Sequence, residues 1–338
     1  MKKSGLILLC LAVFSTLVIQ AQPRKNKKPK TSSNFILEPI GKGVWAAINN
    51  DHFGKSICNA GIVDLGDRLL IFDAFMNPAA AEELKAMAED MTGKSVGLVI
   101  NSHFHSDHVR GNQVFAGEAT IISTNFTRQQ IENVGPDDLA KEERNAPGLL
   151  QATKRRLTTA SSSEKEELSH WVGYYEGMME SARRLKVIVP NITFNDSLWI
   201  NGSERSVKLL ECKNGHTPSD IVMLIPDEGI VFMGDLLFIE RHPWIADGNP
   251  KGWQESLKLL YEDPHYNKYI PGHGPVGNKE SVRQLYGYLQ FICEMADKAT
   301  TDELRAEVAT SEIPAEFQHW MFGRFYQPNL QFLLQKHK

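Results

Sequence analysis

The sequence predicts an α/β protein built as a four-layer αβ/βα sandwich, in which two sheets pack face to face and helices cover their outer surfaces. Two observations predict this class: short apolar strand segments recur in both halves of the chain, and helical segments follow them. A third is that polar, Gly- or Pro-bounded turns come directly after several of the strands. With 338 residues, 42% of them hydrophobic, the chain can bury a large core.

The first half carries four predicted strands and one helix. Apolar, strand-forming residues fill each strand segment, and the Gly66-Asp67 turn separates the second strand from the third. The helix begins at Pro78, after which apolar residues recur at helical spacing. The predicted strands are residues 44–48, 60–63, 69–72 and 96–100.

Residues 125–190 interrupt this order with polar, helix-forming sequence that lacks strand signals. Ser163 is predicted to cap a helix that has one apolar stripe. We interpret the segment as a helical insertion packed on the body, the alternative being a lid or a dimer surface. The stripe consists of Leu168, Val172, Tyr175, Met179 and Ala182.

Strands return in the second half, with His216 in the loop after the first of them and Asp235 just past the third. A short strand near residues 269–270 runs into His273, and a helix follows from Lys279 to about Lys298. Residues 301–338 are predicted to be a C-terminal helical extension. The other predicted strands are residues 207–210, 221–225 and 229–233.

Residues 1–21 have the pattern of a signal peptide, with two lysines, an apolar stretch and a small residue, Ala21, at the cleavage point. We therefore expect a periplasmic or secreted protein that is not stably inserted in a membrane after cleavage. An uncleaved anchor is the alternative, although the apolar stretch is shorter than the ~20 residues of a spanning helix. Residues 22–33 are predicted to be a flexible basic linker, with attraction to anionic lipid as the other interpretation.

The formal net charge is −4, and because the linker concentrates basic residues, the folded body is more acidic still. Such a surface repels nucleic acid, so a small molecule is the expected partner. No oligomeric state is predicted. The cysteines have no paired spacing, which excludes a disulfide framework. Cys212 is assigned to a strand, a ligand role being the alternative.

The turns after the strands are rich in side chains that bind metals. The segment HFHSDH at residues 103–108 is the densest, and residues 215–217, 234–236 and 271–274 add more. Imidazoles and carboxylates suit zinc or iron, and seven of them predict two metal ions side by side. Other histidines, such as His170 and His319, are interpreted as ordinary solvated or satisfied residues. The seven ligands are His103, His105, Asp107, His108, His216, Asp235 and His273.

These motifs, in this order, resemble those of the metallo-β-lactamase superfamily over residues 34–300. NAGIV at residues 59–63 and LIFD at residues 70–73 also resemble that family's opening strands and an aspartate beside its ligands. The resemblance implies that Asp235 bridges two ions, two zinc ions being expected, with iron or manganese as alternatives. It further implies that His103, His105 and His216 hold the first ion, and that Asp107, His108 and His273 hold the second.

Two cations that share a water molecule lower its pKa enough to supply hydroxide near neutral pH, and they polarise a carbonyl group. Asp107 and Asp235 are therefore the predicted catalytic carboxylates, with Asp107 orienting the water or carrying a proton. Asp73 is predicted to accept a hydrogen bond that orients a ligand, a simple turn role being the alternative.

The predicted activity is hydrolysis of an ester, lactone, thioester or amide/β-lactam bond in a small molecule. β-Lactamase activity proper is an alternative, although one large group of those enzymes has cysteine where this chain has Asp235. A mononuclear iron persulfide dioxygenase and a non-catalytic metal-binding protein are further alternatives. Ribonuclease Z activity is disfavoured by the export signal. Glyoxalase II activity is disfavoured because residues 301–338 show no clear set of basic residues that would bind a thioester.

Substrate contacts are assigned from position along the chain. Residues 51–55 join two early strands, so His52 and Phe53 are predicted to close over the metals, an ordinary hairpin tip being the alternative. Arg241 and His242 follow Asp235 closely and are predicted to meet a polar or anionic substrate. Trp253 is interpreted as a core residue.

Overall fold

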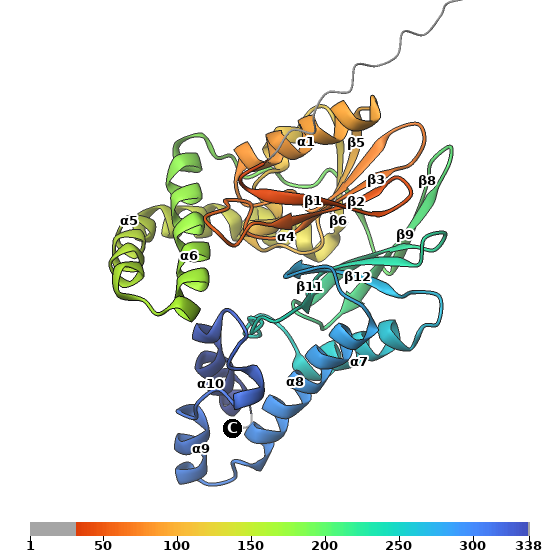
Figure 1. Cartoon of the computed structure of the whole chain (residues 1–338). Helices are drawn as coiled ribbons and strands as arrows, with labels where there is room; N and C mark the ends of the chain where they lie inside the picture. The colour runs from red at the N-terminus through yellow and green to blue at the C-terminus, as the bar shows by residue number, and fades with distance from the viewer. Residues whose placement is uncertain (1–31, 337–338) are drawn as a thin grey trace, which may run out of the picture. The chain divides into compact units, whose positions relative to one another are not determined.

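A computed structural model describes residues 32–336, and two stacked β-sheets form its centre (Figure 1). The first sheet has seven strands that lie in chain order. Its first four strands pair antiparallel, and its last four, which share β4, pair parallel. The strands are β1 (Phe35–Gly41), β2 (Val44–Asn49), β3 (Ala60–Asp64), β4 (Leu69–Phe72), β5 (Val96–Ile100), β6 (Thr120–Thr124) and β7 (Ile192–Phe194).

The second sheet has five strands in the order β12-β11-β10-β9-β8. Only the β11–β12 pair in it is parallel. Asp235 lies inside β11 rather than just past its end, because that strand continues beyond the irregular pairing at Gly234. The strands are β8 (Ser197–Asn201), β9 (Ser206–Lys213), β10 (Ser219–Ile225), β11 (Ile230–Phe238) and β12 (Lys268–His273).

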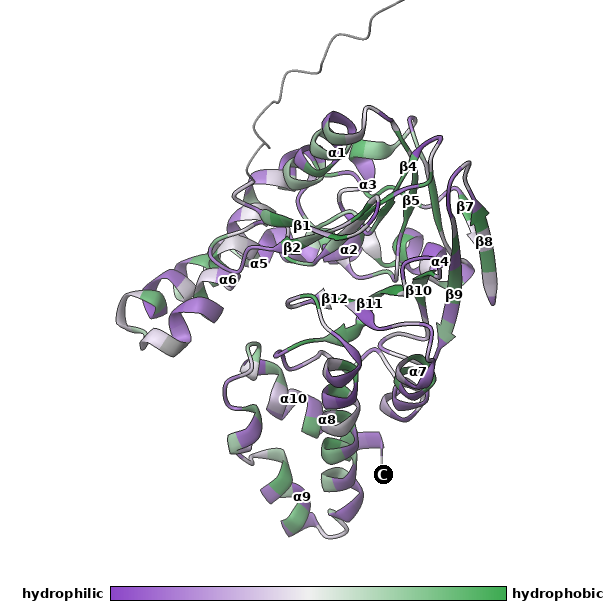
Figure 2. Ribbon diagram, turned by 45° about the vertical axis from the view of Figure 1, so that its right-hand side comes forward, coloured by the Kyte–Doolittle hydropathy of each residue, from purple (hydrophilic) through white to green (hydrophobic). Residues whose placement is uncertain are grey.

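Buried aliphatic and aromatic side chains from both sheets fill the space between them, among them Val63, Leu70, Ile221 and Phe232. Figure 2 shows that the strands of both sheets are mainly hydrophobic. Helix α1 (Pro78–Thr92) covers the outer face of the first sheet, and α7 (Pro250–Glu262) and α8 (Lys279–Lys298) cover that of the second (Figure 1). The predicted four-layer αβ/βα sandwich is confirmed.

Local sequence explains where α1 begins and ends. The side chain of Asn77 accepts a hydrogen bond from the Ala79 amide at 2.8 Å, and Pro78 occupies the first turn, where it loses no helical hydrogen bond. Gly93 ends the helix at φ 72°, a left-handed conformation that glycine adopts without strain. The helix buries Leu84 and several alanines against the sheet.

The predicted insertion is folded into three α-helices, α4 (Asn125–Asn133), α5 (Gly135–Thr159) and α6 (Ser162–Ser181), followed by a short 3-10 turn (Ala182–Arg184). Helix α6 is capped by Ser161, which forms a capping box with Glu164, so the predicted cap at Ser163 is wrong. The buried stripe of α6 includes Met178, whereas Met179 is 45% exposed.

The C-terminal segment folds against the second helical layer. It contains α9 (Asp302–Ala309), two short 3-10 turns (Ala315–Phe317 and Gly323–Phe325) and α10 (Tyr326–Lys336). Its apolar side chains join those of α8 in one buried cluster. No helix within residues 32–336 is long and apolar enough to cross a membrane. The predicted signal peptide and nearly all of the linker lie outside the described residues.

Candidate metal centre

The seven predicted ligands meet at one edge of the sandwich, although they come from both sheets. His103 and His105 lie in the loop after β5, and Asp107 and His108 lie in the short helix α2 (Ser106–Val109) that follows. The second sheet supplies the other three residues from the β9–β10 loop, from β11 and from the end of β12. They form two groups with ligand atoms within 4.8 Å of one another: His103, His105, His216 and Asp235, and Asp107, His108 and His273.

Two glycines shape the backbone around Asp235. Gly234 has φ 51°, and strand pairing with β12 is irregular on both sides of it. A Cβ atom on Gly272 of the neighbouring strand would lie 1.9 Å from Oδ1 of Asp235. Only glycine at position 272 therefore leaves space for the carboxylate between the two strands.

The carboxylate of Asp235 faces both groups, one oxygen to each. Its Oδ2 lies 3.4 Å from Nε2 of His216 and 3.8 Å from Nε2 of His103. Its Oδ1 lies 3.1 Å from Nε2 of His108 and 3.4 Å from Nε2 of His273. This is the placement that a carboxylate bridging two cations requires.

The remaining distances fit metal coordination better than hydrogen bonding. Oδ2 of Asp107 lies 3.3 Å from Nε2 of His273 and 3.5 Å from Nε2 of His108. Ligand atoms about 2.1 Å from one tetrahedral zinc ion are about 3.4 Å apart. Among the described residues, Nε2 of His103, Nε2 of His108 and Oδ1 of Asp235 are buried without a hydrogen-bond partner. Such atoms are costly unless something pairs with them, and a cation would do so.

Asp73 orients one histidine of each group. It follows β4 with φ 61°, and its Oδ2 accepts hydrogen bonds from Nδ1 of His108 and from the Ser102 hydroxyl, both at 2.8 Å. Because that hydroxyl gives its proton to Asp73, it accepts one from Nδ1 of His103, 2.9 Å away. Both imidazoles therefore carry their proton on Nδ1, and their Nε2 lone pairs face the candidate metal positions.

His105 presents its other nitrogen to the centre. Its Nδ1 lies 3.0 Å from Nε2 of His216, and its Nε2 lies 3.2 Å from Oδ2 of Asp247. Hydrogen bonding from His105 lowers the pKa of Asp247 to about 2, so Asp247 is a charged acceptor. Burial lowers the pKa of His216 to about 3, which keeps it in the neutral form that binds metals.

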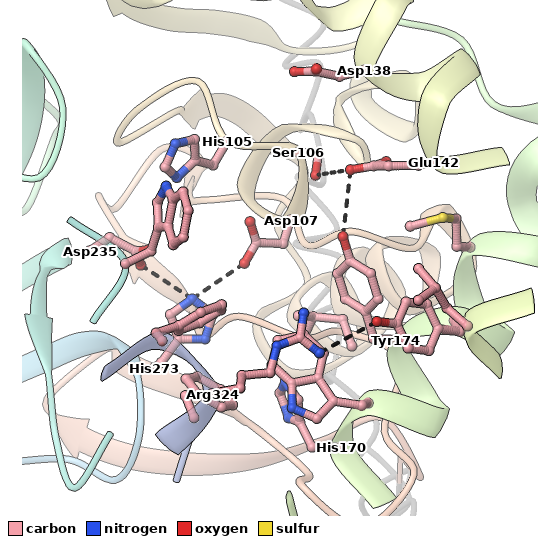
Figure 3. Close-up of a pocket in the computed structure, with 18 of the residues that line it drawn as sticks. His105, Ser106, Asp107, Asp138, Glu142, His170, Tyr174, Asp235, His273 and Arg324 are labelled. Carbon is pink, nitrogen blue, oxygen red and sulfur yellow. Dashed lines mark hydrogen bonds and ion pairs between the residues drawn. The ribbon is translucent and has the colours of Figure 1, made fainter. Parts of the chain in front are cut away.

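A cavity of about 540 Å³ opens over this centre (Figure 3). One wall comes from α5 and α6 of the insertion, and another comes from residues 322–325 of the C-terminal segment. The insertion is thus both packed on the body and part of the site. Figure 3 shows Tyr174 from the insertion and Arg324 from the C-terminal segment around the same space as Asp107 and His273.

The four predicted substrate contacts do not line this cavity. His52 and Phe53 line a separate surface hollow. Arg241 is buried, and it pairs with Asp51 and donates to the Ile239 carbonyl at 2.9 Å. His242 is fully buried in the second helical layer, so the structure places none of the four at the cavity over the metal centre.

Hydrogen bonds fix the role of His242 within that layer. Its Nε2 donates to the Phe317 carbonyl at 3.2 Å, and its Nδ1 accepts from the Tyr288 hydroxyl at 3.0 Å. Trp253, predicted as a core residue, is fully buried, and its Nε1 donates to the Leu236 carbonyl at 2.9 Å.

Several cavity residues were not predicted, namely Trp171, Tyr174, Asp247 and Arg324. His170 was interpreted as a satisfied residue; it lines the cavity, with Nδ1 3.0 Å from Oδ1 of Asp51. A signal existed in HWVGYY at residues 170–175, where aromatic side chains fall on both faces of the helix rather than on one stripe. No comparable signal marks Arg324, which lies far along the chain from the rest of the site.

The fold and the site together define a sandwich protein whose two sheets jointly supply paired metal-ligand groups. The sequence matches the profile of the Metallo-beta-lactamase superfamily over residues 53–273. This chain belongs to that superfamily.

Known relatives are distant. A metallo-beta-lactamase type 2 of Bacteroides fragilis is 20% identical over 86% of this chain and 98% of its own length. A linear primary-alkylsulfatase of Pseudomonas sp. (strain ATCC 19151) is 22% identical over 73% of this chain, which spans only 49% of that enzyme. The solved structure of a metallo-beta-lactamase from Pontibacter korlensis has 15% identity and a TM-score of 0.54, covering 76% of this chain and 99% of that one.

Proposed function

We propose that the protein is an exported hydrolase that uses two metal ions, zinc first among them, to cleave an ester, lactone, thioester or amide-type bond in a small molecule. The observation that carries this proposal is the position of Asp235, whose two oxygens face two separate ligand groups. The complete second group of Asp107, His108 and His273 favours two metals over the single iron of a persulfide dioxygenase.

Bound cations would supply Lewis acidity toward the scissile group and would lower the pKa of water. The chain's own residues perform the positioning. Asp73 fixes the donor atoms of His103 and His108, and Asp247 fixes those of His105. Asp107, at the cavity, is placed to accept a proton or to orient water, and the walls of the cavity limit the access of bulk solvent.

The relatives carry the names of enzymes for different bonds, a β-lactam and an alkyl sulfate. The test is therefore a metal analysis of the purified mature protein together with turnover assays on nitrocefin, a lactone, a thioester, a phosphodiester and an alkyl sulfate. We expect about two zinc ions per chain and turnover of one bond type. Two bound metals without any turnover would favour the non-catalytic metal-binding protein, and one iron without hydrolysis would favour the dioxygenase.

Asp235→Ala and His216→Ala should each lose both metal and activity. His319→Ala is the matched control, because this exposed histidine lies outside both ligand groups. Full metal content in either site variant would contradict the ligand assignment.

The proposed location rests on residues 1–21 alone. Expression of the full chain in a bacterial host, followed by fractionation and mass spectrometry, should recover a periplasmic protein that begins at Gln22. A full-length, membrane-bound product would replace this proposal with an uncleaved anchor.

A further inference from the structure

Arg324 differs from the other arginines near the site in having no acidic partner. Arg241 pairs with Asp51, and Arg110 pairs with Glu142. Among residues 32–336, no carboxylate forms an ion pair with Arg324, and its one hydrogen bond runs from Nη1 to the Tyr175 hydroxyl at 3.5 Å. Most of its N–H donors are therefore open to a ligand.

Aromatic rings hold this guanidinium at the cavity wall. Its central carbon lies 3.7 Å from the ring centroid of Trp171, and 5.4 Å from that of Phe325. Trp171 is itself 8% exposed and packs against Tyr174, Tyr175 and Phe325. Because a guanidinium over an indole face is held by cation–π attraction, its side chain is largely fixed before a ligand arrives.

Trp171 and Arg324, which stack on each other, come from two separate parts of the chain. Trp171 belongs to α6, and Arg324 belongs to a 3-10 turn near the C-terminus, beyond the matched residues 53–273. Both line the cavity that also contains Asp107, Asp235 and His273. A molecule bound with its scissile group at the centre thus has an apolar aromatic wall and the unpaired guanidinium of Arg324 within the same cavity (Figure 3).

We propose that Arg324, held on Trp171, binds an anionic oxygen group of the substrate, a carboxylate or sulfate joined to an apolar portion that contacts the aromatic wall. The planar fork of N–H donors suits such a group. This inference rests on the proposed hydrolase function. It narrows the substrate class to anionic molecules with an apolar part.

The experiment is calorimetric binding of 1-octanesulfonate and of 1-octanol to the metal-loaded protein. Sulfonate is a weak metal ligand that shares the proposed anionic geometry, and the alcohol lacks the charge. The variants are Arg324→Ala, Arg324→Lys and, as the matched control, Arg184→Ala, because exposed Arg184 does not line the cavity. Turnover of a carboxylate-bearing ester and of its neutral methyl ester is measured with the same proteins.

We expect Arg324→Ala to weaken sulfonate binding by about tenfold to a hundredfold, the usual range for a hydrogen bond to a charged group. Arg324→Lys should recover part of the loss, while octanol binding and the Arg184→Ala protein should be unchanged. In Arg324→Ala, KM for the carboxylate-bearing ester should rise by a similar factor, whereas kcat/KM for the neutral methyl ester should equal that of the wild type. Equal sulfonate affinity in Arg324→Ala and wild type would overturn the inference.

The two proposals fail separately. If no ester and none of the panel substrates is cleaved but sulfonate binding depends on Arg324, the hydrolase function is wrong and the anion site remains. If esters are cleaved with the same KM in Arg324→Ala and wild type, the hydrolase function remains and the anion site is wrong.

Discussion

Replacing Asp73 by asparagine tests whether one carboxylate fixes ligands in both metal groups. Asn has nearly the same shape and tolerates the left-handed backbone, here φ 61°, so the fold should be retained. One carboxylate oxygen becomes an amide NH₂ group, which cannot accept hydrogen bonds. If the NH₂ group replaces Oδ2, it faces Nδ1 of His108 and the Ser102 hydroxyl, and both imidazoles lose the partner that holds the proton on Nδ1.

The size of the effect follows from the number of contacts. Asp73 acts on His108 directly and on His103 through Ser102, so metal affinity should fall in both groups, by about 10- to 100-fold in each. Removing the relay alone with Ser102→Ala should weaken only the group that contains His103. Fluorescent-chelator competition, with two zinc ions fitted per chain, measures both constants.

Asp196→Asn is the matched control for this experiment. Asp196 has φ 62° and a carboxylate, yet it is an exposed partner of Lys213 and does not line the cavity. Its zinc affinities should equal those of the wild type. Unchanged zinc affinities in Asp73→Asn would refute the tautomer argument, and a loss of equal size in Asp196→Asn would show that the backbone conformation is responsible instead.

Three further predictions concern stability and the shape of the site. Burial holds the pKa of His242 at about 4 against an ordinary 6.5, so the unfolded chain binds this proton first on acidification. The free energy of unfolding should therefore fall by up to about 3 kcal/mol as the pH drops from about 6.5 to about 4. Urea denaturation of His242→Gln at several pH values should show a free energy of unfolding that lacks this contribution to the pH dependence. Asp51→Ala leaves the Arg241 guanidinium buried without its carboxylate partner and should lower the free energy of unfolding in urea by about 3–5 kcal/mol. The double variant Asp51→Ala/Arg241→Met should restore part of this loss. Equal urea midpoints for wild type and Asp51→Ala would contradict the prediction. Gly272→Ala places a methyl group against Asp235 and should reduce zinc affinity by about tenfold or more. Circular dichroism should show that the variant is folded. Zinc affinity equal to that of the wild type would show that β12 can move aside.

Sequence reasoning reached the fold because periodicity is a local property. The strands around Ile71 and Val99 are nearly all apolar, which indicates burial on both faces, and polar turns follow them. Helix α8 was predicted with its bounds as observed, since its apolar spacing is regular. Strands β6, β7 and β8 were missed because they are short and most of them carry several polar residues, and β1 was missed because Glu38 and Pro39 interrupt its apolar sequence.

The ligand set was predictable for a different reason. Four of the ligands fall within residues 103–108, and each of the other three directly follows a glycine, so residue type and context coincide within a few residues. The cavity walls were not predictable in that way. Arg324 and Trp171 meet only because the C-terminal segment folds back toward α6, and nothing near position 324 encodes that contact. Arg241 and His242 follow the end of β11 closely in sequence, yet both are buried and neither lines the cavity, because closeness to Asp235 along the chain does not fix where a side chain lies.

The division of the ligands between the two sheets has a mechanical consequence. His103 and His108 are carried by the first half of the chain, and His216 and His273 are carried by the second. Protein contacts also link the halves at this edge: the Asn59 side chain donates to the Pro271 and Gly274 carbonyls, at 2.9 and 2.8 Å. A cation bound here would be a removable cross-link between two half-molecules, and its binding free energy would add to the resistance of the chain to unfolding. Removal of the metal by a chelator would then weaken the contact between the two sheets as well as stop turnover. The supply of metal would therefore govern how long the protein stays folded.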